Sequence, residues 1–127
     1  MLVIESWVIN DDSSVPVSSG VVLEALRSRV DRGQLETWLI SSSGRLLAFT
    51  TNTERAMVML LEEEGDPGEH AVDPESEGSS DGFVLSNGQQ DEYPDQDTVP
   101  IGEAFRLVEH IVGTGSWPAD AHWVVDR

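Results

Sequence analysis

The pattern of apolar and polar positions predicts strands over the first half of the chain. Residues 2–9, LVIESWVI, are rich in β-branched and aromatic side chains and precede a cluster of turn formers, NDDSSVP, so we expect a first strand there. Residues 35–63, LETWLISSSGRLLAFTTNTERAMVMLLEE, follow a period close to two and contain two turn sequences, SSSGR and TNTER. We therefore expect three further strands joined by tight turns, with the apolar run AMVMLL as a central strand.

Apolar side chains of this block are expected to fill the core. Aromatic and thioether side chains are ordinary core residues, so we assign the tryptophan, the phenylalanine and the methionines to the interior. With a period of two, the residues that share a face within each strand are Trp38 with Ile40, Leu47 with Phe49, and Met57 with Met59 and Leu61.

Two segments carry the period of an amphipathic helix. Residues 18–33, SSGVVLEALRSRVDRG, begin with serines that can cap a helix and end at Gly33. Residues 100–112, PIGEAFRLVEHIV, place Pro100 at a first helical position and Glu103 in the first turn. The apolar stripes are Val22, Leu23, Leu26 and Val30 in the first helix, and Ile101, Ala104, Phe105, Val108, Ile111 and Val112 in the second. We expect the arginines of the first helix to be solvated and to complement its macrodipole: Arg27, Arg29 and Arg32.

The composition changes abruptly at residue 62. Residues 62–97 hold 13 of the 24 acidic residues and no lysine or arginine. Residues 62–81 are rich in acids, glycine, proline and serine, so we expect an acidic surface loop there, with a short strand near EHAVD. The sequence FVLSNG then predicts a short strand ending in an Asn-Gly turn, followed by an acidic loop around Tyr93. DAHWVVDR predicts the last strand.

This order of elements indicates an α+β fold. Consecutive strands leave too few alternating strand–helix units for a doubly wound sheet. We expect a mostly antiparallel sheet of about six strands with two helices on one face, in a single domain over residues 1–127.

The net charge points to a basic partner. The chain of 13.9 kDa carries a formal charge of −17, with seven basic residues, all arginine. Phosphate binding depends on Lys and Arg, so nucleic acid is not expected as a direct partner. No cysteine is present, which excludes disulfides and thiolate metal sites. The first residues lack a basic segment and a run long enough to span a membrane, so we expect a cytoplasmic chain.

Motifs for catalysis are missing from the sequence. The histidines, at 70, 110 and 122, lack metal-site spacing, and no GxSxG elbow or phosphate loop occurs. The acids around Tyr93 lack the alternating pattern and central glycine of a calcium loop. We expect no catalytic residue, metal or cofactor.

An acidic surface that contains an aromatic side chain is the remaining candidate site. Aromatic residues often anchor protein interfaces, and acids speed the encounter with a basic partner. The residues predicted to bind a partner are Asp91, Glu92, Tyr93, Asp95, Asp97 and Trp117. The alternative is structural: Tyr93 covers a sheet edge and Trp117 closes the core.

The C-terminal half resembles immunity protein family one, whose small proteins are encoded beside bacterial polymorphic toxins. The resemblance lies in residues 82–127, and more loosely in the strand block from residue 35. Its elements are the Asn-Gly turn, the helix start with Pro100, Glu103 and Ala104, the TGSWP segment with Gly115 and Pro118, and Trp123 in the final strand.

The resemblance implies an α+β inhibitor that binds and occludes a cognate toxin, often a nucleic-acid deaminase or nuclease. It supplies no catalytic residues, and the shared residues Gly115, Pro118 and Trp123 would maintain the fold. Two alternatives stay open: a regulatory protein that binds another basic protein, and a small ligand-binding domain or enzyme with a pocket at His110 or His122.

Overall fold

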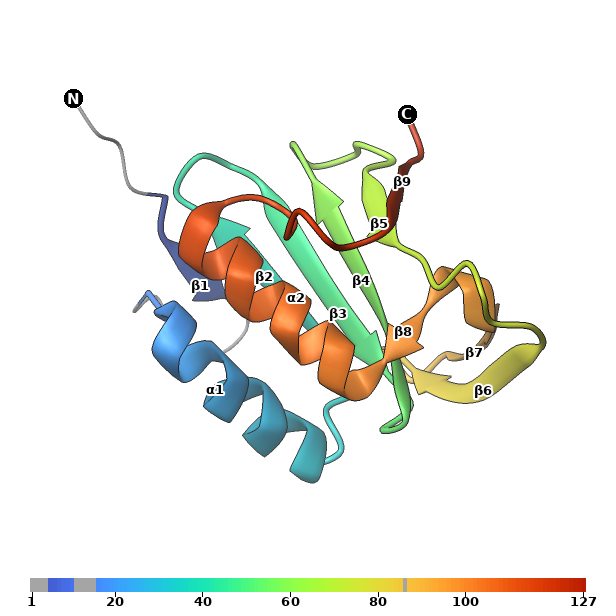
Figure 1. The fold of residues 1–127 in the computed structure, drawn as a ribbon. Coiled ribbons are helices and arrows are strands. Elements are labelled where there is room, and N and C mark those ends of the chain that lie inside the picture. The colour runs from blue at the N-terminus through green and yellow to red at the C-terminus, as the bar shows by residue number, and fades with distance from the viewer. Residues whose placement is uncertain (1–4, 11–15, 86) are drawn as a thin grey trace.

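The computed structural model describes residues 5–10, 16–85 and 87–127 (Figure 1). Its helices are α1 (Ser19–Asp31) and α2 (Ile101–Thr114), and a single 3-10 turn, η1, spans Asp95–Asp97 within these residues. The strands are β1 (Trp7–Ile9), β2 (Glu36–Ser41), β3 (Leu46–Thr51), β4 (Arg55–Leu61), β5 (Glu69–Ala71), β6 (Ser79–Val84), β7 (Gln90–Pro94), β8 (Val99–Pro100) and β9 (Trp123–Val125).

The strands form one large antiparallel sheet and one separate hairpin. The large sheet has seven strands in the order β1-β2-β3-β4-β5-β9, with β8 paired to one end of β4. β6 and β7 pair only with each other among the described strands. The α+β class and the antiparallel sheet are confirmed, and the sheet has seven strands where about six were expected.

Both helices pack on the same face of the sheet, as Figure 1 shows. α1 follows Ser18, whose backbone is extended, and the chain leaves it through Gly33 at φ +84°. α2 ends at Gly115, which adopts the left-handed conformation and donates its N–H to the Ile111 carbonyl. Glycine suits both ends because a Cβ disfavours positive φ. Both predicted helices are confirmed.

The core lies between the helices and the inward side chains of the sheet. Phe49 on β3 is fully buried and stacks on Phe105 of α2, with ring centroids 5.5 Å apart. Leu47 and Phe49 are core residues as predicted. The buried stripe of α2 also includes Leu107, which the sequence analysis omitted, whereas Ile101 is half-buried.

Three predicted core residues lie elsewhere, on the side of the sheet away from the helices. Trp38, Met57 and Met59 are half-buried and do not belong to the main cluster of the described core. Their strands are apolar on both faces, so the period of two could not tell which face the helices cover. We call this side the outer face and define it by Trp38, Ile40, Leu46, Ala48, Met57, Met59 and Leu61.

Arg29 corrects a second expectation. Arg27 and Arg32 are exposed as predicted, but Arg29 is 3% exposed and donates from Nε to the Thr37 hydroxyl at 2.9 Å. Position 29 falls on the side of α1 that faces β2, three residues after the buried Leu26. Arg27 places its guanidinium over the Phe105 ring at 5.1 Å.

The acidic half has more regular structure than the sequence suggested. The expected strand near EHAVD is β5, but β6 begins at Ser79, inside the segment expected to be a loop. The acidic segment around Tyr93 forms strand β7 and the turn η1. Pairing with β6 explains the error, because β7 gains its hydrogen bonds from β6 even though its own side chains are mostly polar.

Two other expectations concern the ends of the chain. The first strand is confirmed at residues 7–9, whereas residues 2–4 and most of the turn cluster that follows lie outside the described residues. The last strand is confirmed as β9. No helix in the described part of the chain is long and apolar enough to cross a membrane.

Gly68 joins β4 to β5 in a conformation that a side chain would disturb. It has φ +82°, and a Cβ there would lie 2.9 Å from the Leu60 carbonyl oxygen. Gly44, in the β2–β3 turn, has φ +90° but nothing within 4 Å of such a Cβ. A substitution at Gly44 therefore tests backbone strain alone, whereas one at Gly68 tests backbone strain together with steric conflict.

We expect Gly44→Ala to lower the free energy of unfolding by about 1 kcal/mol through positive φ alone. Gly68→Ala is expected to lower it by about 2–4 kcal/mol, because displacement of the β4 backbone adds to that strain. Urea unfolding of both variants measures the difference. Equal losses of unfolding free energy in the two variants would show that the backbone near Gly68 can move aside for a Cβ without an energetic cost.

Candidate functional site

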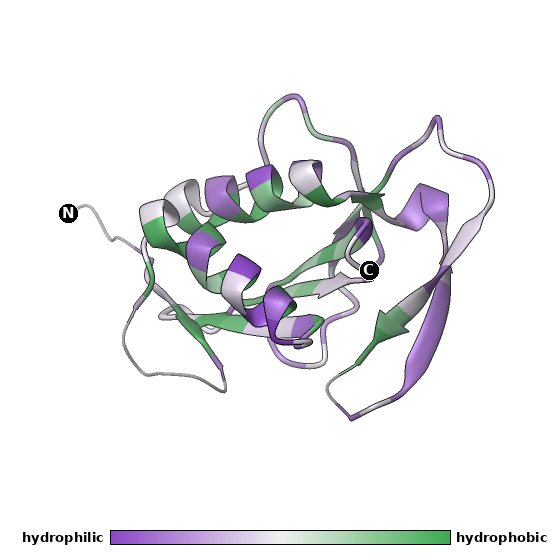
Figure 2. Ribbon diagram, turned by 90° about the horizontal axis from the view of Figure 1, so that it is seen from below, coloured by the Kyte–Doolittle hydropathy of each residue, from purple (hydrophilic) through white to green (hydrophobic). Residues whose placement is uncertain are grey.

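The hairpin of β6 and β7 forms the candidate site. Ser79 pairs with Pro94 and Val84 with Gln90, and the register shifts between Ser80 and Phe83. At the turn, Gly88 takes φ +89°, as expected for an Asn-Gly turn. The hairpin projects beyond the side of the sheet that the helices leave open, and its strand β7 is hydrophilic (Figure 2).

Phe83 and Tyr93 hold the two strands of the hairpin together. Phe83 is fully buried, and the Tyr93 ring meets it edge to face with centroids 4.9 Å apart. The Tyr93 hydroxyl donates to Asp91 Oδ2 at 2.7 Å. Tyr93 thus has a structural role on the strand, as one of the two sequence interpretations proposed.

The local environment sets the ionisation of the Tyr93 phenol and the Asp91 carboxyl group. Burial raises the pKa of Tyr93 to about 12, together with the hydrogen bond from Tyr93 to Asp91 and the nearby charges of Asp91 and Glu36. Hydrogen bonds from Gln89 and Tyr93 hold the pKa of Asp91 below its usual value. The pair is therefore a neutral phenol against a carboxylate at neutral pH.

Arg55 fixes the base of the hairpin. Its Nη2 donates to Asp73 Oδ2 at 2.9 Å and to the carbonyl oxygens of Asp95 and Thr98 at 3.1 Å. Asp95 in turn accepts a hydrogen bond from the Ser80 hydroxyl at 2.5 Å. Hydrogen bonds from Ser76 and Arg55 lower the pKa of Asp73. Asp95 therefore serves the fold of this region.

Asp97 is held by His70. His70 on β5 places Nε2 3.0 Å from Asp97 Oδ1 and Nδ1 2.7 Å from Asp126 Oδ2. A histidine that donates from both ring nitrogens is protonated. Burial lowers the pKa of His70, but the hydrogen bonds and charges of Asp126 and Asp97 outweigh burial and raise it. These two contacts join η1 to Asp126, and they favour the protonated form of His70 because a carboxylate only accepts hydrogen bonds.

Trp117 lies apart from the hairpin, in the segment between α2 and β9. It is 8% exposed, its Nε1 donates to Glu69 Oε1 at 3.0 Å, and its ring stacks on Trp123 at 5.8 Å. Little of its surface is therefore available to a partner. Of the six predicted partner-binding residues, the structure brings together five on β7 and η1, and separates Trp117 from them.

The acids of residues 62–97 differ in whether they make ion pairs. Glu62, Asp66 and Glu69 lie near Arg127, Asp73 and Asp95 near Arg55, and Asp97 near His70. Among the described residues, these seven acids of the segment make no ion pair: Glu63, Glu64, Glu75, Glu77, Asp81, Asp91 and Glu92. All but Asp91 are exposed.

Sequence reasoning named only Asp91 and Glu92 of these seven. The other five were predicted only as members of an acidic loop. Nothing in the local sequence distinguishes them from the acids that pair with Arg55 or Arg127. Only the fold shows which arginine each acid reaches, because the ion pairs of Arg55 and Arg127 with these acids join residues 18 to 65 positions apart.

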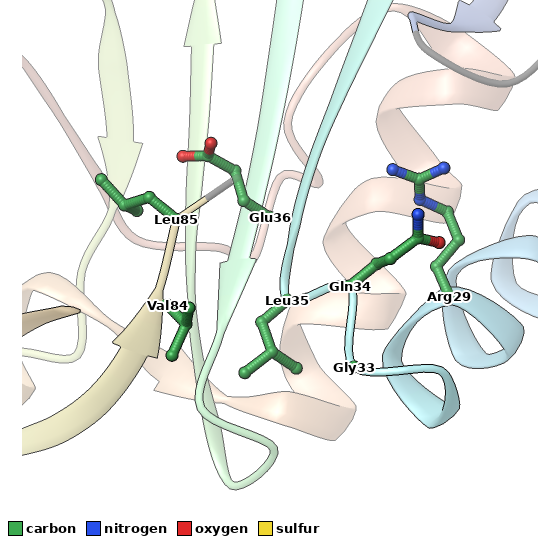
Figure 3. Close-up of a pocket in the computed structure, with 7 residues that line it drawn as sticks. All are labelled: Arg29, Gly33, Gln34, Leu35, Glu36, Val84 and Leu85. Atoms are coloured by element: carbon green, nitrogen blue, oxygen red, sulfur yellow. The ribbon is translucent and has the colours of Figure 1, made fainter. Parts of the chain in front are cut away.

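The two pockets next to the hairpin and next to His122 are small and offer little for catalysis. One of about 220 Å³ lies between the end of α1, the start of β2 and the hairpin (Figure 3), where Leu35 and Val84 approach each other. A second of about 220 Å³ includes His122. At the end of α2, His110 donates from Nδ1 to the Ser116 carbonyl at 2.8 Å, and the same nitrogen lies 3.2 Å from the Thr114 hydroxyl. The described residues contain no group of three or more His, Asp or Glu that could hold a metal ion.

Comparison with known proteins finds no protein family that matches this chain and no curated protein that matches it. The resemblance to immunity protein family one therefore rests on the sequence segments quoted above.

The His70 contacts predict a pH dependence of stability. Because the pKa of folded His70 is raised above 6.5, its contribution is complete below that value and is lost as pH rises through the folded pKa. We expect the free energy of unfolding of the wild type to fall between about pH 6 and about pH 8.5. In His70→Gln this fall should be smaller. Urea unfolding at both pH values measures it, and the same slope in both proteins would contradict the assignment.

Proposed function

We propose that this chain is an immunity protein that binds a basic toxin domain in the cytoplasm and occludes its active site. The observation that carries the proposal is the set of seven acids without ion-pair partners in residues 62–97, among the residues that the structure describes. Self-repulsion of such a set disfavours the folded state, so a partner that neutralises it gives a reason for its presence. The sequence resemblance supplies the toxin class.

The position of these acids suits a protein interface. Glu77, Asp81 and Glu92 are exposed on or beside the hairpin, and Phe83, Tyr93 and Arg55 hold its backbone in place. A preorganised surface loses little conformational entropy when it binds. The hairpin can therefore present its charge in a fixed arrangement.

The mechanism follows from the chemistry of the expected partner. Deaminases and nucleases that act on nucleic acid attract phosphates with Lys and Arg. Carboxylates of the hairpin would occupy such a groove in place of phosphates and block substrate entry. Association would be fast at low salt and slower at high salt, because salt screens the attraction between exposed charges.

The alternatives differ in what they require. A regulatory protein that binds another basic protein would use the same surface, so toxicity of the partner separates the two functions. A ligand-binding domain with its site at His122 is less favoured, since the pocket there, about 220 Å³, is smaller than the roughly 300–1,000 Å³ of most ligand sites.

The first test is capture of the partner from native lysate at low salt, followed by purification of the retained chain. The variant Glu77→Gln/Asp81→Asn/Glu92→Gln removes three charges from the hairpin. The control Glu24→Gln/Asp31→Asn/Glu109→Gln removes the same number of charges, by the same substitutions, from exposed helix positions. We expect the hairpin variant to associate about tenfold more slowly at low salt, and the control to resemble the wild type.

The second part of the test is the toxicity of the captured partner. The purified partner should be basic, should arrest growth when expressed alone, and should lose that effect when expressed with the wild-type chain. A basic partner without toxicity would favour the regulatory alternative. Recovery of no basic partner, or equal association rates for the two triple variants, would refute the proposed role of the hairpin acids.

A further inference from the structure

Part of the outer face of the sheet is apolar. In the strand register, residues directly opposite each other point to the same side. Two apolar rows cross the outer face from β1 to β4: Val8, Ile40, Leu46 and Leu61 in one, and Trp38, Ala48 and Met59 in the other. Polar residues border them, because the second row continues into His70 on β5 and the next row consists of Glu36, Thr50 and Met57.

Both helices lie on the opposite face (Figure 1), and no outer-face residue belongs to the main cluster of the described core. Ala48 and Leu61 are buried by their neighbours in the sheet, whereas Trp38, Ile40, Leu46 and Met59 are half-buried. An antiparallel sheet with one solvated face usually alternates apolar and polar residues, and in these two rows that alternation is missing. The missing alternation indicates that something covers the face.

A depression lies within this surface. Trp38, Ile40, Leu46 and Leu61 line a pocket of about 460 Å³, together with Asn10, Glu64 and the turn glycine Gly65. The volume suits one or two apolar side chains of a partner. The carboxylate of Glu64 stands at the edge of this apolar site, where it makes no ion pair with any described residue.

Acids stand at both ends of the outer face. β4 crosses it from Arg55 to Leu61, and residues 62–64 follow directly at the far end. At the near end, the β3–β4 turn meets the hairpin, where the Asn52 side chain donates to the Asp81 carbonyl at 2.9 Å. An apolar centre between charged ends is the usual arrangement of a protein interface.

We propose that the outer face is the apolar centre of the docking surface for the basic partner. The partner would place an apolar side chain against Trp38 in the pocket, with its cations beside residues 62–64 and beside the hairpin acids. This inference rests on the proposed function and adds the surface that supplies most of the affinity, since buried aromatic residues contribute more than exposed charges.

Charge decides between a basic partner and a second copy of the chain. Two copies meeting through this face would bring together two sets of the unpaired carboxylates of Glu63 and Glu64, in a chain whose formal charge is already −17. A basic partner neutralises those groups at the same contact. The outer face is therefore expected to stay open in the isolated protein, which should be a monomer.

The test uses the basic chain recovered by the capture experiment, purified and mixed with the 127-residue protein. We expect Trp38→Ala to weaken the equilibrium affinity by at least about tenfold. The control is Trp123→Ala, the same substitution at a tryptophan on β9 that is 38% exposed, which should bind within about twofold of the wild type. Urea unfolding checks that both variants are folded.

Hydroxyl-radical footprinting of the wild-type complex gives a second measurement that requires no variant. Oxidation of Trp38 and Met59 should fall when the partner binds, whereas oxidation of Trp123 should not change. Protection of Trp123 alone, or full affinity of Trp38→Ala, would overturn this inference and leave the proposed function standing. Failure to recover any basic partner would overturn both.

Sedimentation of the isolated protein at low and high salt tests whether a second copy of the chain covers the outer face. A monomer under both conditions is expected. A dimer that forms at high salt and is abolished by Trp38→Ala would assign the outer face to a second copy of the chain and overturn the assignment to a basic partner.

Discussion

Arg55 connects the acidic half of the chain to the sheet. It is the last arginine before Arg106, and its guanidinium contacts Asp73 in one segment and Asp95 and Thr98 in another. The side chain is largely shielded from water, so these charge-assisted hydrogen bonds are worth more than surface ion pairs. Arg55 therefore fixes the path of the chain from β5 to β8. The position of the hairpin depends on that path.

The structure divides the acids of residues 62–97 into two sets with different physical roles. One set is neutralised by Arg55, His70 and Arg127, and organises the loops. The other set has no ion-pair partner within the described residues and leaves negative charge both beside the hairpin and, at Glu63 and Glu64, after the end of β4. Because unpaired charge of one sign does not help a domain to fold, the proposal of a partner rests on the second set.

Sequence patterns predicted the elements that depend on local order. α2 could be placed because its apolar residues recur with the helical period, and Gly115 marks its end. The strand at Tyr93 was missed because its stability comes from Phe83 on another strand. Five of the six residues predicted to bind a partner lie together on β7 and η1, whereas Trp117 is held in the interior by Glu69 and Trp123, neither of which its local sequence identifies.

The pairing of β5 with β9 has a consequence for the order in which the sheet assembles. β5 contributes three residues and lies between two acid-rich segments, while its partner β9 comes more than fifty residues later in the chain. Closing such a long loop is entropically costly, whereas β2, β3 and β4 join through short turns. The edge of the sheet should therefore form late in folding, against electrostatic repulsion, and refolding should become faster as added salt screens the acids.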